Sequence, residues 1–316
     1  MAYGFCGLSL RQTAAWAEAA NVASISDVAL LKRLRSAAGW LGHLLARKLA
    51  ERAAPLPESR TRLRIVDATT VSGPGNTGTD WRVHLGLDLA SSCIDHVELT
   101  DVRGGESLRR FRFAKGDIVV ADRGYSHRAG LASVARRGGD FIVRLNWQNV
   151  PLQLQNGRRF DLLGWLRTIP EATAAESVVQ LKPDPTQNLP ALPVRLVAVR
   201  KSEAAAEEAR KKLLTKASRR QRESTTTALE MASYVVVVTS LDSDVLSAEQ
   251  TLHLYRFRWQ VEVLFKRLKG LLQLDELHAK DPDLARAFIL SKLLAALVLD
   301  EFTQAFVSFS PWGFNL

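Results

Sequence analysis

The chain has 316 residues, 47% of them hydrophobic and 24% charged, which is enough for two or three domains with large cores. Its net charge of +10 favours a polyanionic partner such as nucleic acid, although a membrane surface or a ribosome would also attract a basic chain. Two cysteines exclude a disulfide framework, and the longest apolar run, LLAALVL at 293–299, is too short to cross a bilayer. We therefore expect a protein of a reducing compartment that is neither exported nor inserted in a membrane.

The N-terminal region, residues 1–60, is predicted to be helical. Apolar residues at three- and four-residue spacing predict helices in SLRQTAAWAEAANV and in SISDVALLKRLRSAAGWLGHLLARKLAER, with Ser24 or Ser26 as an N-cap. The helices could form a helix-turn-helix that binds DNA, but the pattern fits a plain packing layer equally well. APLPESR at 54–60 predicts a linker.

From residue 61 the pattern becomes that of a mixed sheet. RLRIVDATTV, WRVHLGLDLA and CIDHVELTDV predict a three-stranded antiparallel meander, and a helical patch follows near 106–113. GDIVVADRGY, SHRAGLASVARRG and DFIVRLN then predict a strand, a helix and a second strand that pairs parallel to the first. These elements indicate an α/β core, whose first part is residues 61–146.

Residues 147–240 interrupt this alternation. Strand-like PVRLVAVRK and SYVVVVTSL lie on either side of the charged run SEAAAEEARKKLLTKASRRQRES. We interpret the segment as an inserted, mostly β subdomain with a basic helical arm. In residues 241–316 the chain returns to helix, from about 247 to 273 and again from 283 to 308.

Three acidic residues lie where chemistry is a candidate role. Asp67 is inside an apolar β-run, where a charge is unfavourable unless a cation, a hydrogen-bond network or a metal compensates it. Asp122 directly follows a predicted buried strand, where sheet proteins place ligand-binding groups, with a turn or N-cap aspartate as the alternative. Glu262 is the single acid among five Lys or Arg in YRFRWQVEVLFKRLKG, where an i,i+4 partner for Lys266 is the alternative.

The order and spacing of these acids make the pattern specific. On a helix, Tyr255, Arg258, Glu262 and Lys269 lie within about 60° on one face. Asp67 in a strand, Asp122 at a strand end, a long insertion and Glu262 on a helix resemble the DDE transposases. More narrowly, the four helical residues match the Tyr-x2-Arg-x3-Glu-x6-Lys signature of the cut-and-paste insertion-sequence subgroup, and DATT and ADRGY match the blocks around its first two acids.

The resemblance covers about residues 61–275, and it implies an α/β fold with an RNase H-like mixed sheet flanked by helices. It implies a DNA transposase that cleaves transposon ends and transfers the freed strands, by cut and paste through a hairpin intermediate. Asp67, Asp122 and Glu262 would be the catalytic residues and the ligands of two Mg²⁺ or Mn²⁺ ions per active site, since carboxylates suit these hard cations.

The resemblance also implies partners and DNA contacts. The partners would be double-stranded DNA, at inverted-repeat ends and at the target, and a second copy of the chain in a homodimeric synaptic complex, in a bacterial cytoplasm beside the nucleoid. Trp147 and Trp259 are candidate DNA contacts because a flipped base stacks on tryptophan in the hairpin intermediate, although Trp147 fits a core or hinge residue equally well. The candidate DNA contacts are Tyr255, Arg258, Lys269, Arg123, Trp259, Trp147 and Lys266, the last of which could also be a solvated surface lysine.

Two other functions fit the same sequence. One is a non-catalytic DNA-binding remnant of a transposase, and the other is a metal-dependent DNA nuclease without strand transfer. The intact set of three acids favours an enzyme over a remnant. Inverted repeats on both sides of the coding region, with a short direct duplication outside them, would favour an active element.

Overall fold

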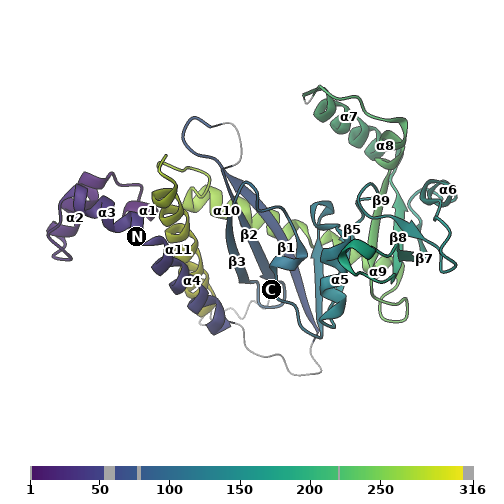
Figure 1. Cartoon of the computed structure of the whole chain (residues 1–316), viewed down its shortest axis with the longest axis horizontal. Coiled ribbons are helices and arrows are strands. Elements are labelled where there is room, and N and C mark those ends of the chain that lie inside the picture. The colour runs from purple at the N-terminus through teal and green to yellow at the C-terminus, as the bar shows by residue number, and fades with distance from the viewer. Residues whose placement is uncertain (1, 53–60, 77–79, 220, 309–316) are drawn as a thin grey trace. The chain divides into compact units, whose positions relative to one another are not determined.

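The structure is a computed structural model that describes residues 2–52, 61–76, 80–219 and 221–308 (Figure 1). It divides into two compact units, which we describe separately. The first unit comprises Met1–Pro57, Asp67–Gly105 and Gln260–Leu316, and the second comprises Glu58–Val66 and Glu106–Trp259. The linker expected at 54–60 lies outside the described residues.

Helices form the N-terminal part of the first unit, as the apolar spacing predicts. Their bounds are α1 Ala2–Phe5, α2 Leu10–Ala19, α3 Asp27–Ser36 and α4 Ala38–Arg52. The Ser26 hydroxyl accepts the Ala29 N–H at 3.2 Å, which confirms the predicted N-cap of α3. The helix α4 packs beside α11 (Pro282–Ser308), and Arg52 at the end of α4 donates to the Asp300 carboxylate at 2.7 Å.

The first unit also contains the predicted meander. Its strands are the second half of β1 (Arg62–Val71), β2 (Trp81–Asp88) and β3 (Cys93–Asp101), in the order β3-β2-β1. The strands β2 and β3 pair antiparallel, with a register shift between Gly86 and Leu87. The helix α10 (Trp259–Leu272) packs its apolar side into the unit through the buried residues Val261, Phe265, Leu268 and Leu272.

The second unit is built on a mixed sheet in the order β1-β4-β5-β9-β8-β7-β6. As predicted, β4 (Asp117–Ala121) and β5 (Asp140–Arg144) are parallel neighbours joined by α5 (Arg128–Arg136), and the first half of β1 pairs parallel to β4. The other strands are β6 Leu152–Gln153, β7 Ala174–Leu181, β8 Leu192–Arg200 and β9 Tyr234–Thr239, each antiparallel to its neighbours. The predicted α/β class with a mixed sheet and flanking helices is confirmed.

Helices cover both faces of this sheet. Leu131 and Val134 of α5 join a core cluster with alternate strand residues such as Leu196 of β8. Arg195, the preceding residue of β8, points to the opposite face, where its guanidinium donates to the Thr251 hydroxyl of α9 (Ala248–Arg256) at 3.2 Å. Every residue of β4 is buried, as expected for a strand covered on both sides.

The segment expected as an inserted β subdomain continues this sheet. Its last strand, β9, pairs antiparallel with β5, and β8 and β7 follow. The segment also contains three helices, α6 (Leu162–Arg167), α7 (Glu203–Arg219) and α8 (Thr226–Met231), and α7 is formed by the charged run. Figure 1 shows α7 and α8 standing away from the ends of β8 and β9, in keeping with the predicted arm. The four sequence regions, as domain boundaries, stay a prediction.

Two predicted helices differ from the structure. The patch near 106–113 is only a 3-10 turn, Leu108–Arg110. The helix predicted from 247 to 273 is divided into α9 and α10. Between them, Phe257 donates its N–H to Leu254 and Arg258 donates to Tyr255, so that i→i−3 bonds tighten the chain and interrupt the α-helical pattern. The signature residues therefore span a helix junction.

A buried ion cluster lies at the start of the parallel pair β1–β4. The Asp117 side chain is 0% exposed and accepts from Arg62 at 2.7 and 3.0 Å, and from Arg64 at 3.5 Å. It also accepts the Ala114 N–H at 2.9 Å. Arg62 is the Cα partner of Asp117 in the sheet register. The cluster therefore favours the register in which the two strands pair.

We predict that Asp117→Ala lowers the free energy of unfolding by about 3–5 kcal/mol, because two guanidinium groups lose the carboxylate that compensates their burial. Urea denaturation followed by circular dichroism measures the change. Glu171→Ala, at an exposed carboxylate, is the control and should cost less than about 0.5 kcal/mol. Equal midpoints for the two variants would contradict a structural role for the cluster.

Candidate active site

The two predicted strand acids follow one register pair. The last Cα partners of β1 and β4 are Val66 and Ala121, and Asp67 and Asp122 are the residues that directly follow them. Asp67 is half-buried, and its Oδ1 accepts the Ala68 N–H at 2.8 Å. The two acids thus occupy equivalent positions, each directly after the last residue through which β1 and β4 pair.

Asp122 begins a tight turn without capping it. Its backbone oxygen accepts the Tyr125 N–H at 3.0 Å, which forms the 3-10 turn Arg123–Tyr125, but its side chain makes no capping bond. The N-cap alternative therefore does not describe this carboxylate. A Cβ on Gly124 of the same turn would overlap the Glu106 carboxylate, so Glu106 is an acid beside the turn that sequence reasoning missed.

Tyr255 links Asp122 to the signature. Its hydroxyl donates to Asp122 Oδ1 at 3.4 Å, and the Arg258 side chain hydrogen-bonds the same phenol. Burial, together with the Asp122 charge, raises the pKa of Tyr255 to about 12, although Arg144 and Arg258 act in the opposite direction. The phenol therefore remains protonated and acts as a hydrogen-bond donor to the carboxylate at neutral pH.

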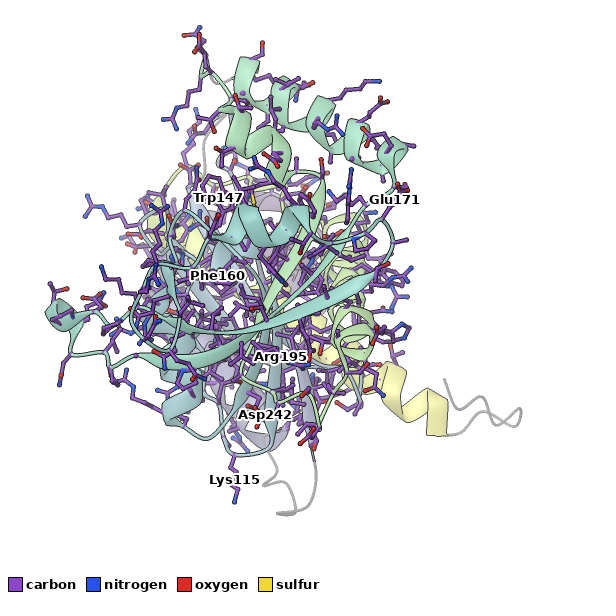
Figure 2. All side chains as sticks on the ribbon, turned by 90° about the vertical axis from the view of Figure 1, so that its right-hand side faces the viewer. Lys115, Trp147, Phe160, Glu171, Arg195 and Asp242 are labelled. Atoms are coloured by element: carbon purple, nitrogen blue, oxygen red, sulfur yellow. The ribbon has the colours of Figure 1, made fainter. Side chains whose placement is uncertain are left out.

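Arg195 fixes the helix that carries Tyr255. Its buried guanidinium donates to the Leu241 and Leu246 carbonyl oxygens at 3.1 and 2.7 Å, and to the Glu176 carboxylate at 2.7 Å, besides Thr251 of α9. Figure 2 places Arg195 among the strands, whereas Lys115 extends outward. A strand arginine carries no such signal in the sequence, because only tertiary packing creates its partners.

In the first unit, α10 carries the other two signature residues. Glu262 is exposed in the first turn and Lys269 is half-buried in the last turn, away from the buried apolar side. The helix ends at Leu272, and the next residue, Gln273, has a positive φ of 50° and accepts a bond at its backbone oxygen from the buried Lys292 ammonium. Beyond it, Glu276 forms a parallel bridge with Ser72. The prediction that the four signature residues share one face of a single helix is wrong, because Tyr255 is buried on α9 and only Glu262 and Lys269 lie on α10.

The remaining candidates have different environments. Trp259 is 51% exposed and Lys266 is exposed, whereas Trp147 is half-buried against the core of the second unit. Trp147 also lines a cavity of about 480 Å³, together with Arg123. Among the residues that the structure describes, no group of three or more His, Cys, Asp or Glu is close enough to hold a metal ion.

The family model described as transposase DDE domain matches residues 58–298. The chain belongs to this family. It is 42% identical over 314 residues to the putative transposase InsL of insertion sequence element IS186A from Escherichia coli, a match that covers 98% of this chain and 85% of that protein. It is also 42% identical to the transposase of insertion sequence element IS421 from Escherichia coli, with the same coverage.

More distant similarities are weaker. The transposase of insertion sequence element IS1151 from Clostridium perfringens is 21% identical, over 71% of this chain and 52% of that protein. Among solved structures, the piggyBac transposase synaptic complex with hairpin DNA has a TM-score of 0.41 at 9% identity, over 77% of this chain and 49% of that chain, a likeness too weak to bear on function.

Membership in this family makes the chain an insertion-sequence transposase, a polynucleotidyl transferase or nuclease that acts on DNA. The family generally uses divalent metal ions. Across the part of the chain that the structure covers, no helix is long and apolar enough to cross a membrane.

We predict that Tyr255 titrates near pH 12. Its pKa is higher in the folded than in the unfolded state, where it is 10.0, so its contribution to stability is complete below pH 10 and is lost as the pH rises through about 12. The melting temperature of wild type should therefore fall more steeply over this range than that of Tyr255→Phe. Ultraviolet difference titration of the two proteins provides the direct measurement, and a tyrosine titrating near pH 10 in the difference would contradict the buried donor.

Proposed function

We propose that the chain cleaves DNA at transposon ends and transfers the freed strands to a target, by cut and paste through a hairpin intermediate. In this proposal Asp67, Asp122 and Glu262 hold two divalent cations. The main support is the register of β1 and β4, in which Asp67 and Asp122 follow one pair of partners, in a chain 42% identical to insertion-sequence transposases. The intervals of the signature around Glu262 add to it.

The donor chemistry of the three residues fits Mg²⁺ or Mn²⁺. Carboxylate oxygens are the hard ligands that these ions prefer, and Asp122 contributes a carboxylate that no backbone cap occupies. Two such ions, when bound, activate a water and stabilise the leaving oxygen of a phosphodiester. The protonated Tyr255 hydroxyl holds Asp122 Oδ1 and so orients the carboxylate.

The cations of the signature bind the substrate. Arg258 and Lys269 contact phosphates beside the cleaved bond, and Arg123, directly after Asp122, adds another contact. Trp147 and Trp259 are the candidates for stacking an extruded base, and Lys266 is a peripheral contact. Two copies of the chain hold the two ends in a synaptic homodimer. A nuclease without strand transfer remains the second candidate function, since it shares the first cleavage step.

Substitution of the three acids by their isosteric amides tests their role as metal ligands. Asp67→Asn, Asp122→Asn and Glu262→Gln should each abolish Mg²⁺-dependent nicking of end-containing duplex, because each removes a ligand charge, while DNA affinity is kept or rises. Gel-resolved nicking and filter binding measure the two properties. Asp244→Asn, at an exposed acid outside the set, should nick as wild type does. If any triad variant nicks at the wild-type rate, that residue is not a ligand.

Products of the wild-type reaction then separate the two candidate functions. Hairpin ends and joined target strands support the transposase, whereas nicked or linear DNA alone supports the nuclease.

Substitution of the signature cations should weaken DNA binding, unlike substitution of the acids. Arg258→Ala or Lys269→Ala should weaken binding to DNA ends by about 1–3 kcal/mol and reduce the salt dependence of binding, because each removes a phosphate contact. Arg267→Ala, an exposed cation of α10 outside the signature, is the matched control. Affinities of all three variants that agree within error would mean that the signature cations act only through net charge.

A further inference from the structure

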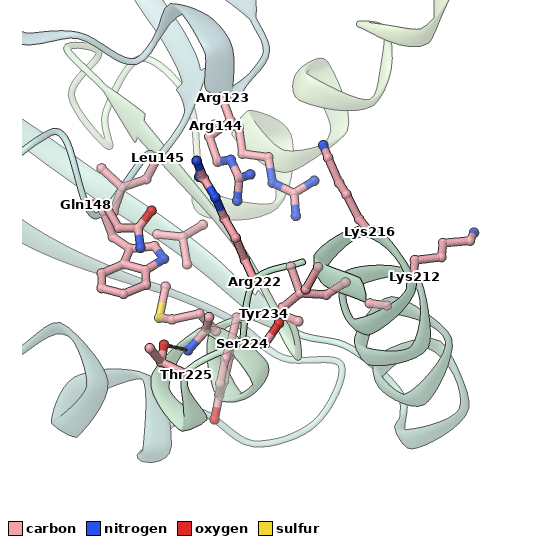
Figure 3. Close-up of a pocket in the computed structure, with 18 of the residues that line it drawn as sticks. Arg123, Arg144, Leu145, Gln148, Lys212, Lys216, Arg222, Ser224, Thr225 and Tyr234 are labelled. Atoms are coloured by element: carbon pink, nitrogen blue, oxygen red, sulfur yellow. Dashed lines mark hydrogen bonds between the residues drawn. The ribbon is translucent and has the colours of Figure 1, made fainter. Parts of the chain in front are cut away.

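A cation-rich cavity begins next to Asp122 within the second unit. The lining includes six basic residues from separate parts of the chain and a single acid, Glu223. Figure 3 shows the side chains of Arg123 and Arg144 entering from the strand ends and Lys216 from α7. The basic residues are Arg123, Arg144, Lys201, Lys212, Lys216 and Arg222. Such a concentration of like charge is unfavourable without an anionic partner.

Arg144 connects this cavity to the candidate active site. Ala121 of β4 and Val143 of β5 are Cα partners, so Asp122 and Arg144 are the next residues of neighbouring parallel strands. Arg144 also acts electrostatically on Tyr255, which bonds Asp122, and on Lys201 of the cavity. Burial lowers the pKa of Lys201, and the charges of Arg144 and Lys212 lower it further. The cavity lining thus includes Arg123, directly after Asp122, and Lys216 of the arm.

The shape and composition of the cavity favour a strand of nucleic acid. Its volume of about 480 Å³ suits a ligand of small-molecule size, and a duplex whose major groove alone is about 12 Å wide does not fit inside. Apolar residues, among them Leu145, Trp147 and Met231, contribute to the lining between the cations. Cations that follow a backbone beside apolar and aromatic surface are typical of single-strand binding.

We propose that this cavity and the α7 arm bind the phosphates of one DNA strand as it leaves the cleavage site at Asp122. The proposal rests on the proposed function and deepens it by assigning Arg144, Lys216 and Arg222 to the substrate. Arg144 contacts the phosphate nearest to the cleaved bond, and the arm holds phosphates farther along the same strand. The arm thereby keeps the strand end in place between successive steps of the reaction.

The test compares two double variants of the arm with equal net charge. Lys212 already faces Glu208 at 2.5 Å, so Lys216→Ala/Arg222→Ala removes two other cavity cations, and Lys211→Ala/Arg219→Ala removes two exposed cations of α7 that do not line the cavity. The probe is a labelled end-containing duplex with a single-stranded extension. The cavity variant should bind it at least about tenfold more weakly, with a salt slope reduced by about two, whereas the control changes affinity about twofold.

Each outcome has one meaning. Equal losses in the two double variants would overturn the proposal, because the arm would then act only through its charge. Equal losses on blunt duplex and on extended duplex would also overturn it, because the strand would not enter the cavity. Inorganic pyrophosphate that competes as strongly as the oligonucleotide would identify a site for a small anion and overturn it too.

Nicking by wild type is measured in the same preparations. A wild type that binds as expected but does not cleave would refute the proposed function while the strand-binding cavity stands. A wild type that cleaves, with identical binding by both double variants, would refute the cavity alone.

Discussion

The buried carboxylate of Asp117 is the interaction on which the rest of the described structure depends. An isolated buried charge is strongly unfavourable, and the guanidinium groups of Arg62 and Arg64 compensate it only when β1 and β4 pair in one register. A slip by one residue would turn the side chains of one strand to the other face of the sheet. The same register determines which residues follow the last paired positions, and these are Asp67 and Asp122. Ion pairing at the beginning of the two strands thus determines which residues follow their last paired positions.

Local patterns were sufficient to predict many elements. The strand, helix and strand between Asp117 and Arg144 follow from continuous apolar runs and helical spacing, and the Ser26 cap follows from its position before a helical pattern. The division of the helix at Phe257 could not be predicted, because the apolar spacing continues across it and only the backbone bonds change. The pairing of β9 with β5 joins residues about 95 positions apart, such as Val143 and Val238, and no local signal encodes it.

The candidate site was predictable where spacing carries the information. The intervals from Tyr255 to Lys269 and the position of Asp122 after a buried strand were visible in the sequence. The bond from Tyr255 to Asp122 was not, because the partner of a hydroxyl depends on which helix packs over which strand. Arg144 and Arg195 look like ordinary strand cations until their neighbours in space are known. The contacts of charged strand residues are therefore the part of the site that the sequence does not reveal.

The pairing of β9 with β5 has a consequence for how genes of this kind can change in length. If the segment 147–240 were lost, β5 would become an edge strand with unpaired N–H and C=O groups beside the buried residues Ile142 and Val143. Such an edge recruits other chains and promotes aggregation. A change of length confined to α7 and α8 leaves the pairing of β9 with β5 in place, whereas removal of the whole segment exposes this edge. The element therefore depends on segment 147–240, although this segment contains none of the acids Asp67, Asp122 and Glu262.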